Sequence, residues 1–255
     1  MAIINFEFAS KTLCQTARVK IFIPDNILQR GNMKDTAVMY LLHGKGDNEK
    51  SWGIESNAYK YAKQYGVIMI MPFAANSFYT NMAYGDRYWG FIAEELPKVL
   101  ENSLKISSSK EKTFVCGYSM GGYGALKLGL TYPERYSAVG TLSGSLRSMK
   151  ENKSKIVSGE RPDLFLVFGD CGEKVKEEND IYYLTSKALK EGKNIPKLYI
   201  YCGKNDSLYD VNIRYKNFAI NNDIDLIFKD DDGNHSFEYW DEQLNIFLEV
   251  ISNLK

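Results

Sequence analysis

The stretch TFVCGYSMGGYGA, residues 113–125, places one serine among four glycines directly after a β-branched and aromatic run. Within it, Gly117-Tyr118-Ser119-Met120-Gly121 matches the pattern G-x-S-x-G. The residues before this pattern predict a strand, and those after it predict a helix. A serine on such a strand-to-helix turn is typical of a nucleophile elbow, in which the next backbone N–H faces a developing oxyanion. The stretch therefore predicts Ser119 as a nucleophile and the Met120 N–H as an oxyanion donor.

Other glycine-rich loops fit this stretch less well. A dinucleotide-binding loop needs G-x-G-x-x-G, and a phosphate loop needs a lysine directly after its last glycine. Neither is present, because the only nearby lysine, Lys127, lies inside the predicted helix. A purely structural glycine-rich turn remains an alternative for this stretch taken alone.

Short β-rich runs alternate with helical patterns along the whole chain, which predicts βαβ units and a largely parallel sheet. The first two strands are amphipathic and are expected to form an antiparallel hairpin at the sheet edge. The predicted strands are residues 3–8, 17–24, 37–43, 67–72, 113–117, 136–144, 197–203 and 225–229. The predicted helices are residues 57–65, 89–103, 120–131, 181–191, 208–221 and 236–252.

Some local signals refine this outline. Pro97 should start or kink the second helix, and Ser207 with Asp210 three residues on resembles an N-terminal cap. The run LFLVFG, residues 164–169, suits either a strand or a buried helical turn. Without any long linker, residues 1–255 are expected to form a single domain, with the likeliest insertion around residues 145–185.

Composition narrows the class of protein. The chain of 255 residues carries 32 basic and 32 acidic side chains, which argues against nucleic acid or an anionic membrane as a partner. Its four cysteines are scattered without a C-x-x-C pair, which predicts reduced structural thiols and no metal site. No secretory signal and no apolar run of about 18 residues is visible, so a cytoplasmic protein is expected.

Only two histidines are available as a base for Ser119. In the order Ser, acid, His of this kind of site, only His235 follows the serine, in a loop after the last predicted strand. Asp206, which leaves the strand at 197–203, is the predicted acid, and Asp170 is the runner-up. An ordinary surface histidine and a surface aspartate that starts a turn are the alternatives.

The other histidine, His43, follows the third predicted strand in the sequence YLLHGKGDNEKSWG. In folds that carry a nucleophile elbow, the loop after this strand supplies a second oxyanion donor from its backbone. Here that donor would be the N–H of Lys45. The imidazole of His43 is expected to brace the loop rather than to take part in chemistry.

With these pieces in place, the chain resembles the tributyrin esterase group of the esterase D-like α/β-hydrolases. That superfamily also includes S-formylglutathione hydrolases, feruloyl and acetylxylan esterases, and mycolyltransferases. The resemblance spans almost the whole chain. It is carried by YLLHGKGDNEKSW (40–52), FYTNMAYGDRYWGFIAEELPKVL (78–100), KTFVCGYSMGGYGALKLGL (112–130), LYIYCGKNDSLYDVN (198–212) and GNHSFEYWDEQL (233–244).

The resemblance implies an α/β-hydrolase fold, with a mostly parallel central sheet, an N-terminal antiparallel edge and helices on both faces. It also implies a cap-like insertion around 145–185. Ser119, Asp206 and His235 would form the triad, and Lys45 and Met120 the oxyanion hole. The chain departs from the family at Lys45 and Asp47, where relatives usually carry an apolar residue and often a glycine, so the entrance is more polar here.

The implied activity is a serine carboxylesterase for short-chain acyl esters, working without metal or organic cofactor through an acyl-enzyme. Tyr79 and Trp240, beside the predicted loops, are the expected substrate contacts. The alternatives are an acetylxylan or feruloyl esterase, an S-formylglutathione hydrolase-like thioesterase, an acyltransferase sharing the triad, and a catalytically dead hydrolase fold that acts as a binding protein. The expected partner is a small acyl ester, and relatives suggest a homo-oligomer.

Overall fold

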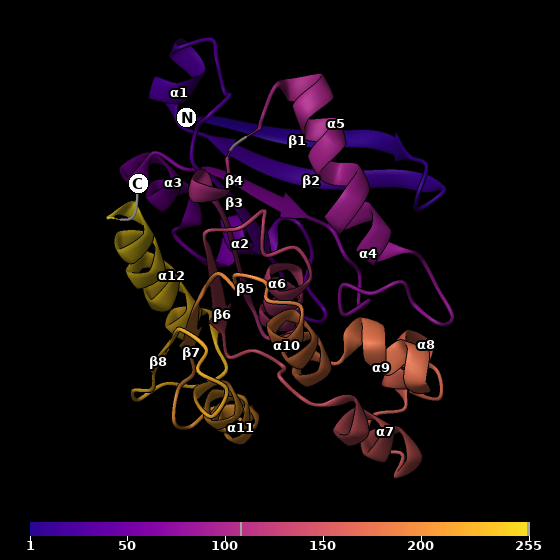
Figure 1. The fold of residues 1–255 in the computed structure, drawn as a ribbon. Coiled ribbons are helices and arrows are strands. Elements are labelled where there is room, and N and C mark those ends of the chain that lie inside the picture. Colours follow the sequence, from indigo (N-terminus) through magenta and orange to yellow (C-terminus); the bar gives the residue numbers. More distant parts are fainter. Residues whose placement is uncertain (108, 254–255) are drawn as a thin grey trace.

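The computed structural model describes residues 1–107 and 109–253, and its centre is a twisted eight-stranded sheet (Figure 1). The strand order is β1-β2-β4-β3-β5-β6-β7-β8. β1 and β2 pair with each other, and β2 with β4, in antiparallel fashion, whereas all later neighbours are parallel. The strands are β1 (Ala2–Ser10), β2 (Gln15–Ile23), β3 (Val38–Leu42), β4 (Ile68–Pro72), β5 (Thr113–Tyr118), β6 (Ala138–Leu142), β7 (Lys197–Tyr201) and β8 (Leu226–Lys229).

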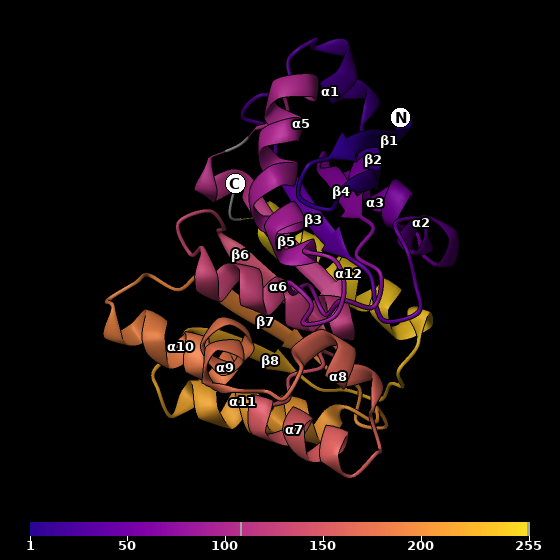
Figure 2. The same cartoon turned by 90° about the vertical axis from the view of Figure 1, so that its right-hand side faces the viewer.

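Helices cover both faces of this sheet (Figures 1 and 2). The larger helices that pack on it are α3 (Ala58–Tyr65), α5 (Leu96–Leu104), α6 (Met120–Thr131), α10 (Ile181–Lys190), α11 (Tyr209–Ile220) and α12 (Phe237–Ser252). The shorter elements are α1 (Asp25–Gln29), α2 (Ser51–Glu55), α4 (Tyr88–Gly90), the π-helical η1 (Phe91–Glu95), the 3₁₀ turn η2 (Lys110–Lys112), α7 (Met149–Val157), α8 (Asp163–Phe168) and α9 (Glu173–Asn179).

Alternate residues of the central strands enter two separate apolar cores. In β3, Tyr40 and Leu42 join the core under α5, α6 and α10, whereas Met39 and Leu41 join the core under α3 and α12. A strand that is buried on both faces reads as a continuous apolar run, which is why the sequence VMYLL could be assigned. The predicted α/β-hydrolase architecture, with its antiparallel N-terminal edge, is confirmed.

The segment between β6 and α10 folds into the three short helices α7, α8 and α9, which project away from the sheet (Figures 1 and 2). The ambiguous run at 164–169 lies in α8. Ser148 caps α7 in a reciprocal capping box with Glu151. That these helices act as a cap over the site stays a prediction.

Two local predictions have opposite outcomes. Pro97 lies in the first turn of α5, which follows the π-helical η1 without a break in helical backbone. The helical hydrogen-bonding pattern thus changes at the predicted position. The Ser207 cap is wrong, because α11 begins after Leu208 and has no side-chain cap. Asp206 takes the Leu208 N–H instead, through its Oδ1 at 2.7 Å.

The four cysteines are free thiols, and only Cys14 is exposed. Over the described ranges, no helix combines the length and the apolar character needed to cross a bilayer.

Lys127 lies wholly inside the protein and joins α6 to two other segments. Its Nζ donates to the Asn179 Oδ1 at 2.6 Å and to the Tyr79 carbonyl at 3.2 Å, and it lies 4.0 Å from the centre of the Trp89 ring. Burial lowers the pKa of Lys127 from 10.5 to about 7. A neutral amine keeps two N–H groups, which matches these two acceptors.

We therefore expect Lys127 to make stability depend on pH. Between about pH 7 and pH 10 the unfolded chain holds a proton on this side chain that the folded chain lacks, so the free energy of unfolding rises with pH. Urea unfolding of the wild type and of Lys127→Met, compared near pH 6 and near pH 9, should show the wild type gaining relative to the variant. Parallel pH profiles for the two proteins would contradict this assignment.

Candidate active site

Ser119 lies on the turn between β5 and α6 in a backbone conformation that side chains seldom adopt, with φ 53° and ψ −116°. Its N–H donates to the Leu142 carbonyl at 2.9 Å. The flanking glycines make this turn possible. A Cβ at Gly121 would lie 2.4 Å from the Leu42 carbonyl oxygen, and one at Gly117 would lie 2.5 Å from the Gly121 backbone. Only glycine at these two positions lets β5 and α6 cross so closely.

Ser119, His235 and Asp206 form one chain of hydrogen bonds. The Ser119 hydroxyl lies 3.1 Å from His235 Nε2, to which it can donate, and His235 Nδ1 lies 2.9 and 3.0 Å from the two Asp206 oxygens. Asp206 follows β7 and His235 stands between β8 and α12, so both side chains come from the carboxyl ends of neighbouring strands. With Nδ1 protonated toward Asp206, Nε2 is free to accept the hydroxyl proton.

Asp206 is held ionised by its surroundings. Burial by itself would raise its pKa, but hydrogen bonds from His235, Ser143 and the Leu208 N–H together lower the pKa of this carboxyl below its ordinary value. Its side chain has no exposed surface. Asp170, the runner-up acid, is exposed and accepts the Gly172 N–H at 3.0 Å instead.

Ser143, which the sequence reasoning missed, supports the carboxylate. It is fully buried directly after β6 with a φ of 48°. The Trp240 Nε1–H donates to its Oγ at 3.0 Å, and its hydroxyl bonds Asp206. The signal was weak, because one serine in SGS after a strand resembles any turn.

The two predicted substrate contacts are both buried. Trp240 places its ring edge-on to His235, with centroids 4.8 Å apart, and stacks on Tyr118. Tyr79 has no exposed surface, and its hydroxyl donates to the His43 carbonyl at 2.9 Å. In this structure the Tyr79 side chain supports the loop after β3, and its contact with substrate stays a prediction. Trp240 packs against the imidazole, and its contact with substrate stays a prediction.

The loop after β3 is braced by His43. Its Nε2 accepts the Ala74 N–H at 2.9 Å, and its Nδ1–H donates to the Gly44 carbonyl at 2.8 Å. Burial lowers the pKa of His43, which agrees with a neutral ring bonded in this way. Among the residues that the structure describes, neither the Lys45 N–H nor the Met120 N–H has a protein acceptor. Both donors are thus available for a ligand.

Side chains of the same loop reach neighbouring elements. Lys45 pairs with Asp163 at the start of α8 at 2.7 Å, and Arg161 binds that carboxylate through two nitrogens at 2.8 Å. Asp47 accepts the Tyr118 hydroxyl at 2.7 Å. Lys45 and Asp47 therefore link this loop to α8 and to the residue before Ser119.

In the described parts of the chain, no three histidine, cysteine or carboxylate side chains cluster closely enough to hold a metal ion.

Known proteins of one family resemble this chain in sequence. The sequence model of the Esterase family matches residues 10–248. An acetyl esterase of Caldicellulosiruptor saccharolyticus is 30% identical over 270 residues, an alignment that covers 100% of this chain and 99% of that protein.

Two solved structures from Staphylococcus aureus have the same fold. Fluorophosphonate-binding serine hydrolase F superposes with a TM-score of 0.87 at 28% identity, covering 99% of this chain and 98% of the other. An S-formylglutathione hydrolase superposes with a TM-score of 0.85 at 28% identity, covering 99% of both chains. The resemblance to esterase D-like α/β-hydrolases is confirmed at this level. The chain therefore belongs to the Esterase family, as a serine hydrolase of carboxylic esters with the α/β-hydrolase fold.

Proposed function

We propose that the protein is a carboxylesterase of the tributyrin esterase type, which hydrolyses short-chain acyl esters through Ser119, His235 and Asp206. The observation that carries this proposal is the 3.1 Å contact between Ser119 Oγ and His235 Nε2, continued to the buried Asp206. The acetyl esterase relative, similar over its full length, supports a short acyl group.

In the proposed reaction, Ser119 Oγ attacks the ester carbonyl while His235 Nε2 takes the hydroxyl proton. The backbone N–H groups of Lys45 and Met120 would stabilise the oxyanion. His235 then gives its proton to the leaving alcohol, and the acyl group stays on Ser119. A water molecule, deprotonated by His235, releases the acid, and the proton returns to Ser119. Asp206 keeps Nδ1 protonated and stabilises the imidazolium throughout.

A thioesterase is the second candidate, favoured by the similarity to the S-formylglutathione hydrolase. The same nucleophile and oxyanion donors would serve a thioester. Acetylxylan and feruloyl esterase activities share this chemistry and differ only in the alcohol or acyl group. Acyl transfer to a sugar would differ in the acceptor that replaces water. A catalytically dead binding protein is disfavoured by the hydrogen-bonded Ser119, His235 and Asp206.

A fluorophosphonate probe tests the proposed nucleophile. We expect one probe per chain, mapped by peptide mass spectrometry to Ser119, and protection by an added short-chain ester. Labelling at another serine, or none, would contradict the proposal.

A substrate panel then tests the proposed specificity. It consists of p-nitrophenyl acetate, butyrate and octanoate, S-formylglutathione, acetylated xylo-oligosaccharide and methyl ferulate. The expected result is the highest kcat/KM on the acetate or butyrate. A higher value for S-formylglutathione, or for either plant-wall ester, would replace the proposed class with that of the preferred substrate.

A further inference from the structure

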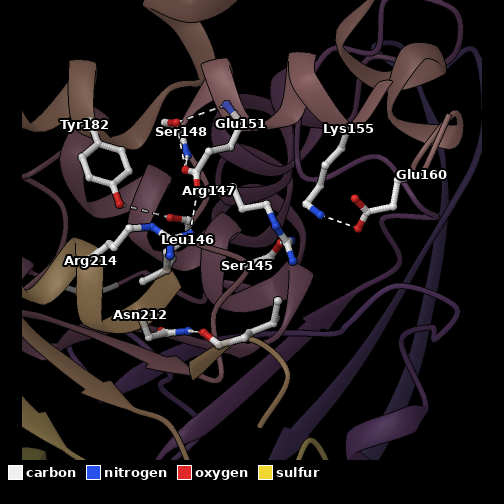
Figure 3. Close-up of polar contacts among 11 residues, drawn as sticks. Ser145, Leu146, Arg147, Ser148, Glu151, Lys155, Glu160, Tyr182, Asn212 and Arg214 are labelled. Carbon is white, nitrogen blue, oxygen red and sulfur yellow. Dashed lines mark hydrogen bonds and ion pairs between the residues drawn. The ribbon is translucent and has the colours of Figure 1, made fainter. Parts of the chain in front are cut away.

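The loop of residues 143–148 leaves β6 beside the proposed nucleophile. Tyr118 and Leu142 are paired in the sheet, so Ser119 and Ser143 leave neighbouring strands at the same end. The Ser145 N–H donates to the Ser119 carbonyl at 2.9 Å. Asn212, fully buried in α11, donates to the Gly144 carbonyl at 2.8 Å and fixes the loop from the other side (Figure 3). The ligand-binding edge of such sheets lies at this end of the strands.

Arg147 turns its guanidinium back toward this edge. Its Nη1 donates to Ser145 Oγ at 3.0 Å (Figure 3). Through the Ser145 N–H, the cation lies two hydrogen bonds from the backbone of Ser119. The side chain is half-buried, and its Nε is shielded from solvent without any partner. Burial lowers the pKa of Arg147, and repulsion from Arg161 adds to that effect. The guanidinium remains charged, because its ordinary pKa is so high.

Four cations, Arg214, Lys155, Lys45 and Arg161, are each paired with a carboxylate, whereas Arg147 is not. Arg214 binds Glu151 at 2.6 Å, and Lys155 binds Glu160. Lys45 and Arg161 share Asp163, as described above. No ion pair within residues 1–107 and 109–253 includes Arg147. Glu151 and Glu160 attract Arg147 through space, but both carboxylates are bonded to other cations. A partly buried charge without a directly bonded counter-ion is unfavourable, and an anion that reaches it would be stabilised by charge-assisted hydrogen bonds.

We propose that Arg147 is a specificity residue that binds a carboxylate carried by the ester substrate, in its acyl or its alcohol part. A carboxylate fits because the planar guanidinium offers two parallel N–H donors to its two oxygens. This inference rests on the proposed function and narrows its substrates to acidic esters. Arg147 touches the substrate away from the reacting carbonyl.

Two pairs of esters distinguish the two positions of the carboxylate. For the alcohol part, 4-acetoxybenzoate is compared with the neutral 4-acetoxybenzamide. For the acyl part, phenyl hydrogen adipate is compared with phenyl hexanoate. We expect the wild type to favour the acidic member of at least one pair in kcat/KM. In Arg147→Gln that ratio should fall by about 10- to 100-fold, the range of a charge-assisted hydrogen bond. Arg147→Lys should recover part of the preference for the acidic ester, because the positive charge remains. The recovery should be incomplete, because lysine lacks the two parallel N–H donors of the guanidinium.

Arg214→Gln is the matched control, because Arg214 is exposed and already neutralised by Glu151. Its ratio should equal that of the wild type. The same ratio in Arg147→Gln as in the wild type would overturn the inference. If thermal unfolding shows that Arg147→Gln does not fold, the wild-type ratios alone decide. A wild type that prefers neither acidic ester would then overturn the inference. Hydrolysis of neutral esters without such a preference leaves the proposed esterase intact. If the wild type neither hydrolyses any ester nor reacts with the fluorophosphonate probe, the proposed esterase and the role of Arg147 are both overturned.

Discussion

Ser119→Ala is expected to lower kcat for p-nitrophenyl acetate by about five to six orders of magnitude, the loss typical of removing a serine nucleophile. Without Oγ no acyl-enzyme can form, and His235 has no hydroxyl to deprotonate. The oxyanion donors remain in place, so a rate above that in buffer should persist. The release of p-nitrophenol, followed with the variant and in buffer alone, measures the two rates.

The fold of this variant should be unchanged, because the Ser119 N–H and carbonyl make their hydrogen bonds through the backbone. Thermal unfolding and circular dichroism check that point. Ser186→Ala serves as the control and should keep the wild-type rate, because Ser186 is exposed on α10 and its hydroxyl donates to the Tyr182 carbonyl. Similar kcat values for the Ser119→Ala variant and the wild type would disprove the nucleophile.

Asp206→Asn should lower kcat by about 10⁴-fold, as in other triads whose carboxylate becomes an amide. The Leu208 N–H holds Oδ1 as an acceptor, so the amide nitrogen would take the place of Oδ2 beside His235 Nδ1. Two donors cannot face each other, and the imidazole would change to the tautomer protonated on Nε2. That nitrogen could no longer accept the Ser119 proton. The pH profile of kcat on p-nitrophenyl acetate checks this, because a rise in activity at alkaline pH would replace the wild-type plateau.

Asp170→Asn separates the two acids considered from the sequence. Its carboxylate is exposed and contacts the Gly172 N–H rather than His235. We expect wild-type kinetics from it. A large loss in this variant, with little change in Asp206→Asn, would reverse the assignment.

Much of the candidate site could be predicted because its chemistry restricts the sequence. A serine between glycines at 117 and 121, with a single histidine after it, leaves few arrangements. The structure brings Ser119, His235 and Asp206 together. Their catalytic roles remain predictions until the variants are measured.

The supporting contacts could not be predicted in the same way. Ser143 and the shared pairing of Asp163 with Lys45 and Arg161 depend on segments far apart in the chain meeting at one point. No local pattern carries that information. The burial of Tyr79 could not be predicted for a related reason, since proximity to a loop in sequence does not say which side of the loop a ring occupies.

For the fold, periodicity identified every strand of the sheet but not their order. The short helices α1, α2, α7 and α9 were not assigned, because helices of so few turns give little periodic signal. The Ser207 cap failed because Asp206 takes the Leu208 N–H with its side chain and the Tyr209 N–H with its carbonyl.

The shape of the sheet has a consequence for how activity is lost. Asp206 and His235 follow β7 and β8, and β8 is the four-residue strand at the margin of the sheet, where no residue is fully buried. Ser119 follows β5, which is buried almost throughout. A margin with little buried surface opens locally at lower free energy than the core does. The rate of ester hydrolysis therefore depends on whether the edge strand β8 stays folded. We expect low concentrations of denaturant to abolish activity while the core of the sheet is still folded.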